Sequence, residues 1–246
     1  MDPASFRTQN LRDWNTPVVV YRAVGKYDEA DLREWLAAQP AGQTLTVLVG
    51  SPSHHRLPAT SLARAQSLWA ETQPDLPLGG VAIPERHTRR GKEHLRLIAK
   101  QEAGCSFFVT QVVYDVNAAK NLVSDYRHEC AARGVEPVPI VFTFSVCGSL
   151  KTLEFLGWLG VDVPRWIQND LRHADDTLQA SYEQSLTTAR ELIGYCRRMG
   201  VPFGVNVESV SIRLTEIEAS VQLAQQLRRE LRRQVEVSVR SRPRGE

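Results

Sequence analysis

The chain has 246 residues, of which 42% are hydrophobic and 24% charged, as in an ordinary globular protein. Its 30 Lys and Arg residues against 28 Asp and Glu residues give a formal net charge of +2, which excludes a strong basic field for nucleic acid. No apolar run is long enough to span a bilayer, and the N-terminus has no apolar signal segment. We therefore expect a cytoplasmic protein that binds neither nucleic acid nor membrane.

Six short apolar runs rich in Val, Ile and Phe predict β-strands. They lack the alternation of apolar and polar residues that marks a strand with one face in water. We therefore expect strands covered on both faces by helices. The runs span residues 17–22, 44–50, 79–83, 106–112, 138–144 and 202–206.

Helical patterns lie between these runs. One helix is expected to start after Asp115 and stop at Gly134, and another to stop near Gly200, because glycine commonly closes helices. The last helix is expected to open with a capping box over residues 215–218. Earlier helices are expected to begin near Asp28, Thr60 and Gly91.

Two architectures fit this alternation of strand and helix, a (β/α) barrel and an open doubly wound sheet. A doubly wound sheet usually carries a glycine-rich phosphate loop after its first strand. Here the segment from Arg22 to Tyr27 contains neither GxGxxG nor a P-loop. Composition alone leaves the choice open.

The four cysteines are scattered along the chain, with no CxxC pair and no histidine at a spacing typical of zinc sites. This pattern predicts buried free thiols in a reducing compartment and no metal site. The cysteines are Cys105, Cys130, Cys147 and Cys196.

Residues 79–115 carry a strand ending in Pro-Glu-x-His, a helix with a lysine, Ala-Gly-Cys, and a strand ending in Thr-Gln with Tyr-Asp beyond. This order resembles the core of the methylenetetrahydrofolate reductase family. Residues 138–167 resemble that family's next strand and helix pair, and residues 200–209 resemble its last strand. The resemblance implies a TIM-type (β/α) barrel whose active site lies at the C-terminal ends of its strands.

The front of the chain is short for a complete barrel. Residues 17–50 fit the family's third strand, third helix and fourth strand, and residues 1–16 are too few for two further βα units. Either the barrel has lost a unit elsewhere or it is incomplete, with open strand edges that invite association. We expect a shortened barrel of about six parallel strands, and a homo-oligomer or a partner chain that covers an edge. The predicted divisions are an extension over 1–16, one barrel-like domain over 17–234 and a basic tail over 235–246.

The resemblance implies that FAD carries hydride from NAD(P)H to 5,10-methylenetetrahydrofolate. His87 and Lys100 match family positions that contact FAD, and Glu93 replaces an aspartate there. Ser51 stands where the family has the aspartate of an Arg-Gly-Asp element. A family tyrosine is replaced by Ile83 and a family arginine by Val207. These losses predict weak or absent FAD binding.

The residues matched to folate binding are better retained. Gln111 matches a glutamine that contacts the pterin, Phe155 matches an aromatic that stacks on folate or nicotinamide, and Asn206 matches a family asparagine. The family's catalytic glutamate on the first strand has no counterpart. Glu208, just past the last strand, is our candidate general acid, and Glu85 is a second candidate.

The predicted function is NAD(P)H-dependent reduction of 5,10-methylenetetrahydrofolate to 5-methyltetrahydrofolate in one-carbon metabolism. One alternative is a degenerate folate-binding or regulatory partner of a reductase, without catalysis of its own. Another is a transferase that passes the folate one-carbon unit to a different acceptor. The fold alone does not separate these functions, because function resides in the site.

Overall fold

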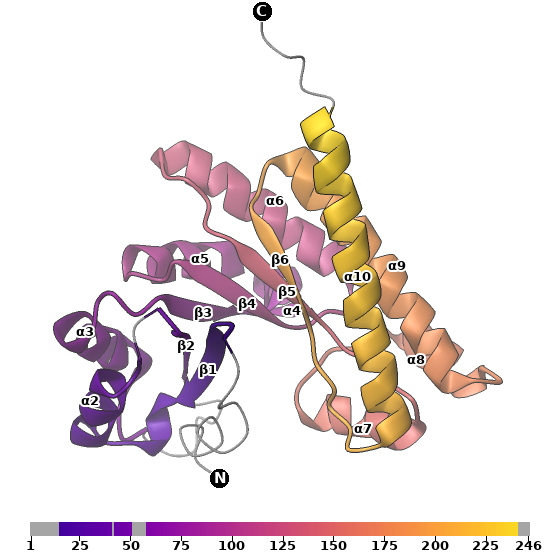
Figure 1. Cartoon of the computed structure of the whole chain (residues 1–246), viewed down its shortest axis with the longest axis horizontal. Coiled ribbons are helices and arrows are strands. Elements are labelled where there is room, and N and C mark those ends of the chain that lie inside the picture. The colour runs from indigo at the N-terminus through magenta and orange to yellow at the C-terminus, as the bar shows by residue number, and fades with distance from the viewer. Residues whose placement is uncertain (1–14, 41, 51–57, 241–246) are drawn as a thin grey trace, which may run out of the picture. The chain divides into compact units, whose positions relative to one another are not determined.

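The computed structural model describes residues 15–40, 42–50 and 58–240 (Figure 1). The strands are β1 (Val18–Ala23), β2 (Thr44–Val49), β3 (Leu78–Ala82), β4 (Phe107–Val112), β5 (Ile140–Phe144) and β6 (Phe203–Val207). They coincide with the predicted apolar runs. The pairs β1–β2, β2–β3 and β5–β6 are parallel.

The strand order decides between the two predicted architectures. The sheet has six strands in the order β1-β2-β3-β4-β5-β6, which is the order of the chain. A doubly wound sheet reverses its order at a switch point, whereas a (β/α) barrel does not. The fold is therefore a shortened TIM-type α/β fold. That a second chain covers an open edge stays a prediction.

Several helices begin or end where the sequence signals predict. They are η1 (Val24–Lys26), α2 (Glu29–Ala37), α3 (Leu62–Thr72), α4 (Pro84–Arg90), α5 (Glu93–Glu102), α6 (Val116–Arg133), α7 (Leu150–Trp158), α8 (Arg165–His173), α9 (Thr177–Met199) and α10 (Leu214–Arg240). Asp28 caps α2 by accepting the Asp31 N–H at 2.9 Å, and Asp115 caps α6. Gly134 and Gly200 close α6 and α9 with a φ of +66° each.

Two helix boundaries differ from the prediction. The helix α10 begins at Leu214, and the Ile217 N–H donates to the Arg213 carbonyl, so Thr215 lies inside the helix and the predicted capping box is wrong. The same helix continues to Arg240, into the segment predicted as a basic tail. The short helix α4 was not predicted, because its seven residues are too few to show a helical apolar stripe.

The chain forms two compact units, and the predicted division at 1–16, 17–234 and 235–246 stays a prediction. Unit 1 comprises residues 1–82 and 96–109, which hold β1 to β3 with their helices, most of α5 and the start of β4. Its packing requires glycine at two positions. A Cβ on Gly79 would lie 2.4 Å from the Phe107 ring, and one on Gly104, whose φ is +102°, would lie 2.5 Å from the Trp69 ring.

Unit 2 comprises residues 83–95 and 110–246. Within it, α6 and α10 pack on α9, and α10 also packs on β6 (Figure 1). A buried apolar cluster joins the end of β4 to α7 and α8, and so fixes these two helices beside the end of that strand. The cluster includes Val112, Tyr114, Leu153, Leu156, Ile167 and Leu171.

All four cysteines are buried free thiols, as predicted. Burial raises the pKa of Cys105 and of Cys147 to about 11, and that of Cys196 to about 12. Thiols with such pKa values are almost entirely protonated at neutral pH, so they are poor nucleophiles.

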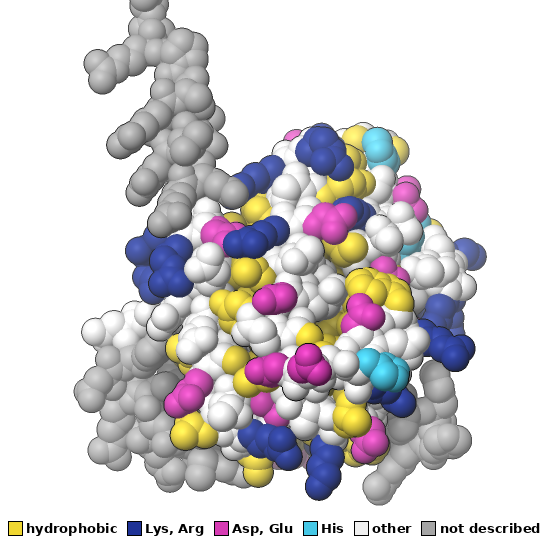
Figure 2. Space-filling view, turned by 90° about the vertical axis from the view of Figure 1, so that its right-hand side faces the viewer, with side chains coloured by type: hydrophobic (Ala, Val, Ile, Leu, Met, Phe, Trp, Pro, Cys, Tyr) yellow, Lys and Arg dark blue, Asp and Glu magenta, His cyan; other side chains and the backbone are white. Residues whose placement is uncertain are grey.

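Among the described residues, no helix combines the length and apolar character that crossing a bilayer requires. On the described part of the face in Figure 2, Lys and Arg side chains are interspersed with Asp and Glu, so neither sign dominates that face.

Candidate functional site

Gln111 and Val112 point to opposite faces of β4. Val112 belongs to the buried cluster with α7 and α8. Side chains alternate between the two faces of a strand, so Gln111 points to the opposite face. Its amide nitrogen donates to the Leu159 carbonyl oxygen at 3.5 Å, and its amide oxygen accepts from the Val112 N–H at 3.1 Å. The predicted pterin-binding amide is therefore held at the end of α7.

Asn206 lies on β6. Its neighbour in the sheet is Thr143, and the Asn206 amide donates to the Thr143 hydroxyl at 3.3 Å. Phe203 lies under the guanidinium of Arg197 from α9, 5.7 Å from its ring centroid, so odd-numbered positions of β6 face that helix. Asn206 points away from α9 by the same alternation.

Phe155 forms an exposed aromatic pair on α7. Its ring stacks on Trp158, with centroids 5.6 Å apart and planes at 14°. Phe155 is 42% exposed and Trp158 is 78% exposed. The Phe155 carbonyl accepts the Leu159 N–H at 2.9 Å, so the Gln111 contact and Phe155 share the last turn of the helix. A flat ring could stack on this aromatic pair while its polar edge meets the amide.

Buried hydrogen bonds fix the start of α7. Ser149 caps the helix by accepting the Thr152 N–H at 3.2 Å. The Thr152 hydroxyl in turn donates to a carboxylate oxygen of Glu216, on α10, at 3.0 Å. Glu216 is only 1% exposed, and a Cβ on Gly148 would lie 2.6 Å from its Cγ. The loop after β5 therefore needs glycine here to let α7 and α10 meet.

Glu208 follows β6 and continues its ladder. Its N–H donates to the Phe144 carbonyl at 3.0 Å, and its exposed carboxyl is hydrogen-bonded to Asn206. The pKa of Glu208 is raised because neighbouring protein removes part of its water, while the Asn206 hydrogen bond acts in the opposite direction. Two residues apart on one strand, Asn206 and Glu208 share a face. Glu208, the candidate general acid, therefore lies on the same face of the strand as Asn206.

Glu85 is a second carboxyl with a shifted pKa, in the first turn of α4. Its side chain is 7% exposed, and its Oε1 has no hydrogen-bond partner in the described part of the chain. Its pKa is raised to about 7, chiefly by burial and also by the charges of Asp162 and Asp115, whereas a backbone hydrogen bond and the charge of Arg89 act in the opposite direction. A carboxyl with this pKa can exchange a proton near neutral pH.

The described residues that match family FAD contacts form hydrogen bonds or ion pairs within the chain. In unit 1, the Lys100 ammonium donates to the Val81 carbonyl. In unit 2, Glu93 is 2% exposed and accepts the Ile83 N–H at 3.3 Å. His87 is 5% exposed and lies 3.0 Å from an Asp125 oxygen. Ser51 lies outside the described residues.

These contacts do not fit a flavin-binding role. Lys100, Glu93 and His87 each use a polar group to bind a backbone or carboxylate partner within the chain. The arginine and the aspartate of the family are also missing from the sequence. We therefore derive no chemical step through FAD.

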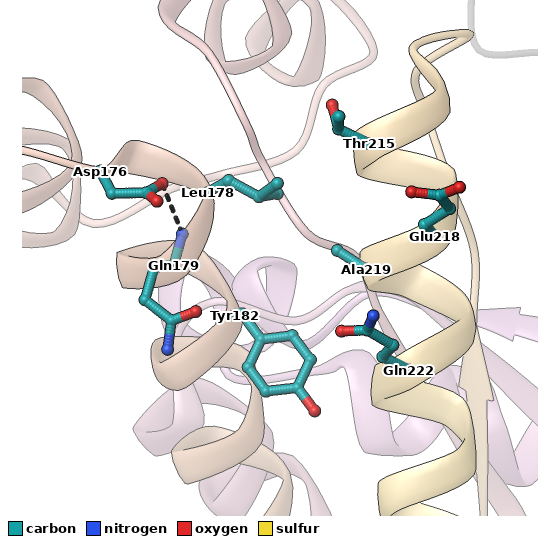
Figure 3. Close-up of a pocket in the computed structure, with 8 residues that line it drawn as sticks. All are labelled: Asp176, Leu178, Gln179, Tyr182, Thr215, Glu218, Ala219 and Gln222. Carbon is teal, nitrogen blue, oxygen red and sulfur yellow. Dashed lines mark hydrogen bonds between the residues drawn. The ribbon is translucent and has the colours of Figure 1, made fainter.

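A separate cavity of about 270 Å³ lies between α9 and α10 (Figure 3). Asp176, Gln179 and Tyr182 line one side, and Glu218 and Gln222 line the other. None of the predicted site residues contributes to its lining. Two carboxylates make the cavity unsuited to an anionic group such as the glutamate tail of a folate.

Sequence reasoning missed Trp158. It stands three residues after Phe155, the spacing that places two side chains on one face of a helix. That spacing was visible in the sequence and could have identified the aromatic pair. The Arg89–Asp162 ion pair, at 2.5 Å, joins residues 73 positions apart and had no local signal.

Comparisons with known proteins agree on one family. The family model Methylenetetrahydrofolate reductase matches residues 71–209. A solved structure with a TM-score of 0.85 and 43% sequence identity covers 92% of this chain and 78% of its own chain. It is an uncharacterized protein from Clostridium thermocellum that binds two copies of 5-methyl-5,6,7,8-tetrahydrofolic acid. A search of curated proteins found no match.

Proposed function

Because the chain belongs to the methylenetetrahydrofolate reductase family, we propose that it binds a reduced folate and reduces 5,10-methylenetetrahydrofolate to 5-methyltetrahydrofolate with NAD(P)H. The observation that carries this proposal is the hydrogen bond from the Gln111 amide to the last turn of α7, beside exposed Phe155. The Clostridium thermocellum relative supports it, since its ligand is the methyl-folate that such a reaction releases.

Gln111, Asn206 and Phe155 are the proposed folate contacts. A pterin ring offers hydrogen-bond donors and acceptors on its edge and an apolar face. The Gln111 amide has both a donor and an acceptor, and its present contact to Leu159 is long, at 3.5 Å, so a ligand can replace it at little cost. The Phe155 ring supplies the stacking surface.

Glu208 is the proposed general acid. A proton delivered to the bridging nitrogen N10 breaks its bond to the methylene carbon and leaves an iminium at N5. Hydride from C4 of the dihydronicotinamide then adds to that carbon, giving 5-methyltetrahydrofolate and NAD(P)⁺. The raised pKa of Glu208 increases the protonated fraction that this step needs. Holding the two rings together and excluding water from the iminium are the protein's other tasks.

A direct assay of NAD(P)H oxidation tests the proposal. Flavin-free protein is mixed with NADH or NADPH, and the loss of reduced nicotinamide is followed before and after 5,10-methylenetetrahydrofolate is added. Oxidation that depends on the folate, with 5-methyltetrahydrofolate recovered by chromatography, is the expected result. Oxidation only after FAD is supplied would contradict direct transfer.

A second candidate function is folate binding without catalysis. It is favoured by the engagement of Lys100 and Glu93 within the chain, which removes two of the matched flavin contacts. Tight binding of 5-methyltetrahydrofolate by calorimetry, with no nicotinamide oxidation under any of these conditions, would select this function over the reductase.

A further inference from the structure

We propose that His87, His94 and Asp125 together bind a divalent metal ion of the zinc class. None of the three is assigned to folate in the proposed function, and the site does not depend on that function. The sequence had predicted no metal site, because it offers no zinc-like spacing of cysteine and histidine.

These three residues of unit 2 come from three different helices. His87 lies on α4, His94 on α5 and Asp125 on α6, and one potential ligand atom from each lies within 4.8 Å of the others. The two imidazole rings meet edge to face, with centroids 5.2 Å apart. Gly91, with a φ of +61°, turns the chain between α4 and α5 and so lets two histidines seven positions apart face each other.

The distances are close to those of a bound ion. Zinc bonds of about 2.0–2.2 Å place tetrahedral ligands roughly 3.3 Å apart. Closing from 4.8 Å requires side chains to rotate, and of the three His94 is partly exposed and Asp125 is exposed. Water can fill the fourth position through the exposed side.

The state of the His87 ring supports metal binding. A carboxylate only accepts hydrogen bonds, so the 3.0 Å contact to Asp125 assigns the proton to His87 Nε2. An ion that takes the place of this proton is bound by Nε2 and by the Asp125 oxygen together. The proton then moves to Nδ1, a buried atom with no partner among the described residues.

His94 offers a second ligand nitrogen. Its Nδ1 is buried and has no hydrogen-bond partner in the described part of the chain. Leaving a buried polar atom unpaired is unfavourable, so an ion bound to this nitrogen removes that cost.

The donor set selects the class of ion. Two imidazoles and one carboxylate suit zinc, and also copper or nickel, whereas calcium and magnesium prefer sites built of oxygen. The ion would tie the turn between α4 and α5 to α6, so binding should stabilise unit 2.

The test uses the full chain, freed of metal by a chelator. Titration with Zn²⁺ in a calorimeter should show one ion per chain, and Co²⁺ should give the visible absorption bands of a tetrahedral site. His94→Ala and Asp125→Asn should each weaken Zn²⁺ binding by about tenfold or more. His173→Ala is the matched control, because His173 lies on α8 and its ring is hydrogen-bonded to the Asn169 carbonyl of the same helix at 2.8 Å.

Stability gives a second readout. Zn²⁺ should raise the melting temperature of the wild type and of His173→Ala, and should raise it much less in the other two variants. His87→Ala is avoided, since a buried ring is removed and the variant could unfold. If His94→Ala and Asp125→Asn bind Zn²⁺ as the wild type does, the ion is adventitious and the proposal is overturned. Absence of wild-type binding at micromolar Zn²⁺ overturns it equally, and neither result bears on folate.

Discussion

The Gln111 amide nitrogen lies 3.5 Å from the Leu159 carbonyl oxygen and so connects the end of β4 to the last turn of α7. This turn also carries the Phe155 carbonyl that accepts the Leu159 N–H. The contact brings an amide of the sheet beside the exposed aromatic pair on α7. Phe155 lies 44 positions after Gln111 in the chain. Four predictions follow the consequences of this geometry and of the packing around it.

Phe155→Ala should weaken binding of 5-methyltetrahydrofolate by about tenfold, the effect of losing one stacking contact of about 1.4 kcal/mol. Because Phe155 is 42% exposed, the melting temperature should change little. Calorimetry with the folate measures the affinity. Leu150→Ala is the matched control, since Leu150 is 47% exposed and begins the same helix. Equal losses in the two variants would show that Phe155 does not contact the ligand.

Glu208→Gln should abolish folate-dependent NAD(P)H oxidation while it preserves folate affinity, because the amide cannot deliver a proton. In the wild type, the rate should fall as the pH rises through the raised pKa of Glu208, since only the protonated carboxyl acts. Glu218→Gln, in the cavity between α9 and α10, is the control and should retain wild-type turnover. If turnover survives in Glu208→Gln, Glu208 is not the general acid and Glu85 becomes the candidate. Glu85→Gln then tests that assignment.

The free energy of unfolding should fall as the pH rises from 4.5 to about 7, because of Glu85. Its folded pKa of about 7 exceeds the ordinary value of 4.5, so the native state holds a proton that the unfolded state releases. The stability is fully present below pH 4.5 and is lost as the pH passes 7. The pKa difference corresponds to about 3 kcal/mol as an upper value. Glu85→Gln should remove this pH dependence and be more stable than the wild type at pH 8, as urea titrations at several pH values can measure. A pH dependence unchanged by the substitution would contradict the assignment.

Gly104→Ala should destabilise the protein by about 3 kcal/mol. Its φ of +102° is strained for alanine, and the new Cβ would lie 2.5 Å from the Trp69 ring. Gly194→Ala is the matched control, because Gly194 lies on an exposed position of α9 with no atom within 4 Å of a new Cβ. It should stabilise the protein by about 0.5–1 kcal/mol through lower chain entropy. Chemical denaturation of both variants provides the measurement, and a similar loss in each would show that the Trp69 contact is not the cause.

The sequence predicted the strands well because buried parallel strands are continuous apolar runs, and such runs are visible in a linear sequence. The caps at Asp28 and Asp115 were visible for the same reason, since a cap and its helix are neighbours in the chain. The beginning of α10 was misjudged because Thr215-Glu-Ile-Glu218 resembles a capping box and yet lies inside the helix. The residues there are compatible with two positions for the start of the helix. The hydrogen bond from the Ile217 N–H to the Arg213 carbonyl favours the earlier position.

The candidate site was only partly visible in the sequence. Gln111 and Asn206 stood out because each is a polar residue at the end of an apolar run. The pairing of Phe155 with Trp158 follows a helical spacing that could have been recognised. The meeting of His87, His94 and Asp125 could not, since it depends on how α4, α5 and α6 pack. Pairwise packing of helices leaves no mark at a fixed sequence spacing.

The four buried thiols can report on the unfolding of the protein. Cys105 belongs to unit 1, whereas Cys130, Cys147 and Cys196 belong to unit 2. In the native state, shielding and a high pKa protect each sulfur from alkylating reagents, so a thiol becomes modified only when its surroundings open. Identifying the modified cysteine by mass spectrometry at increasing denaturant concentration would therefore reveal whether the two units lose their structure together or in succession, without any introduced label.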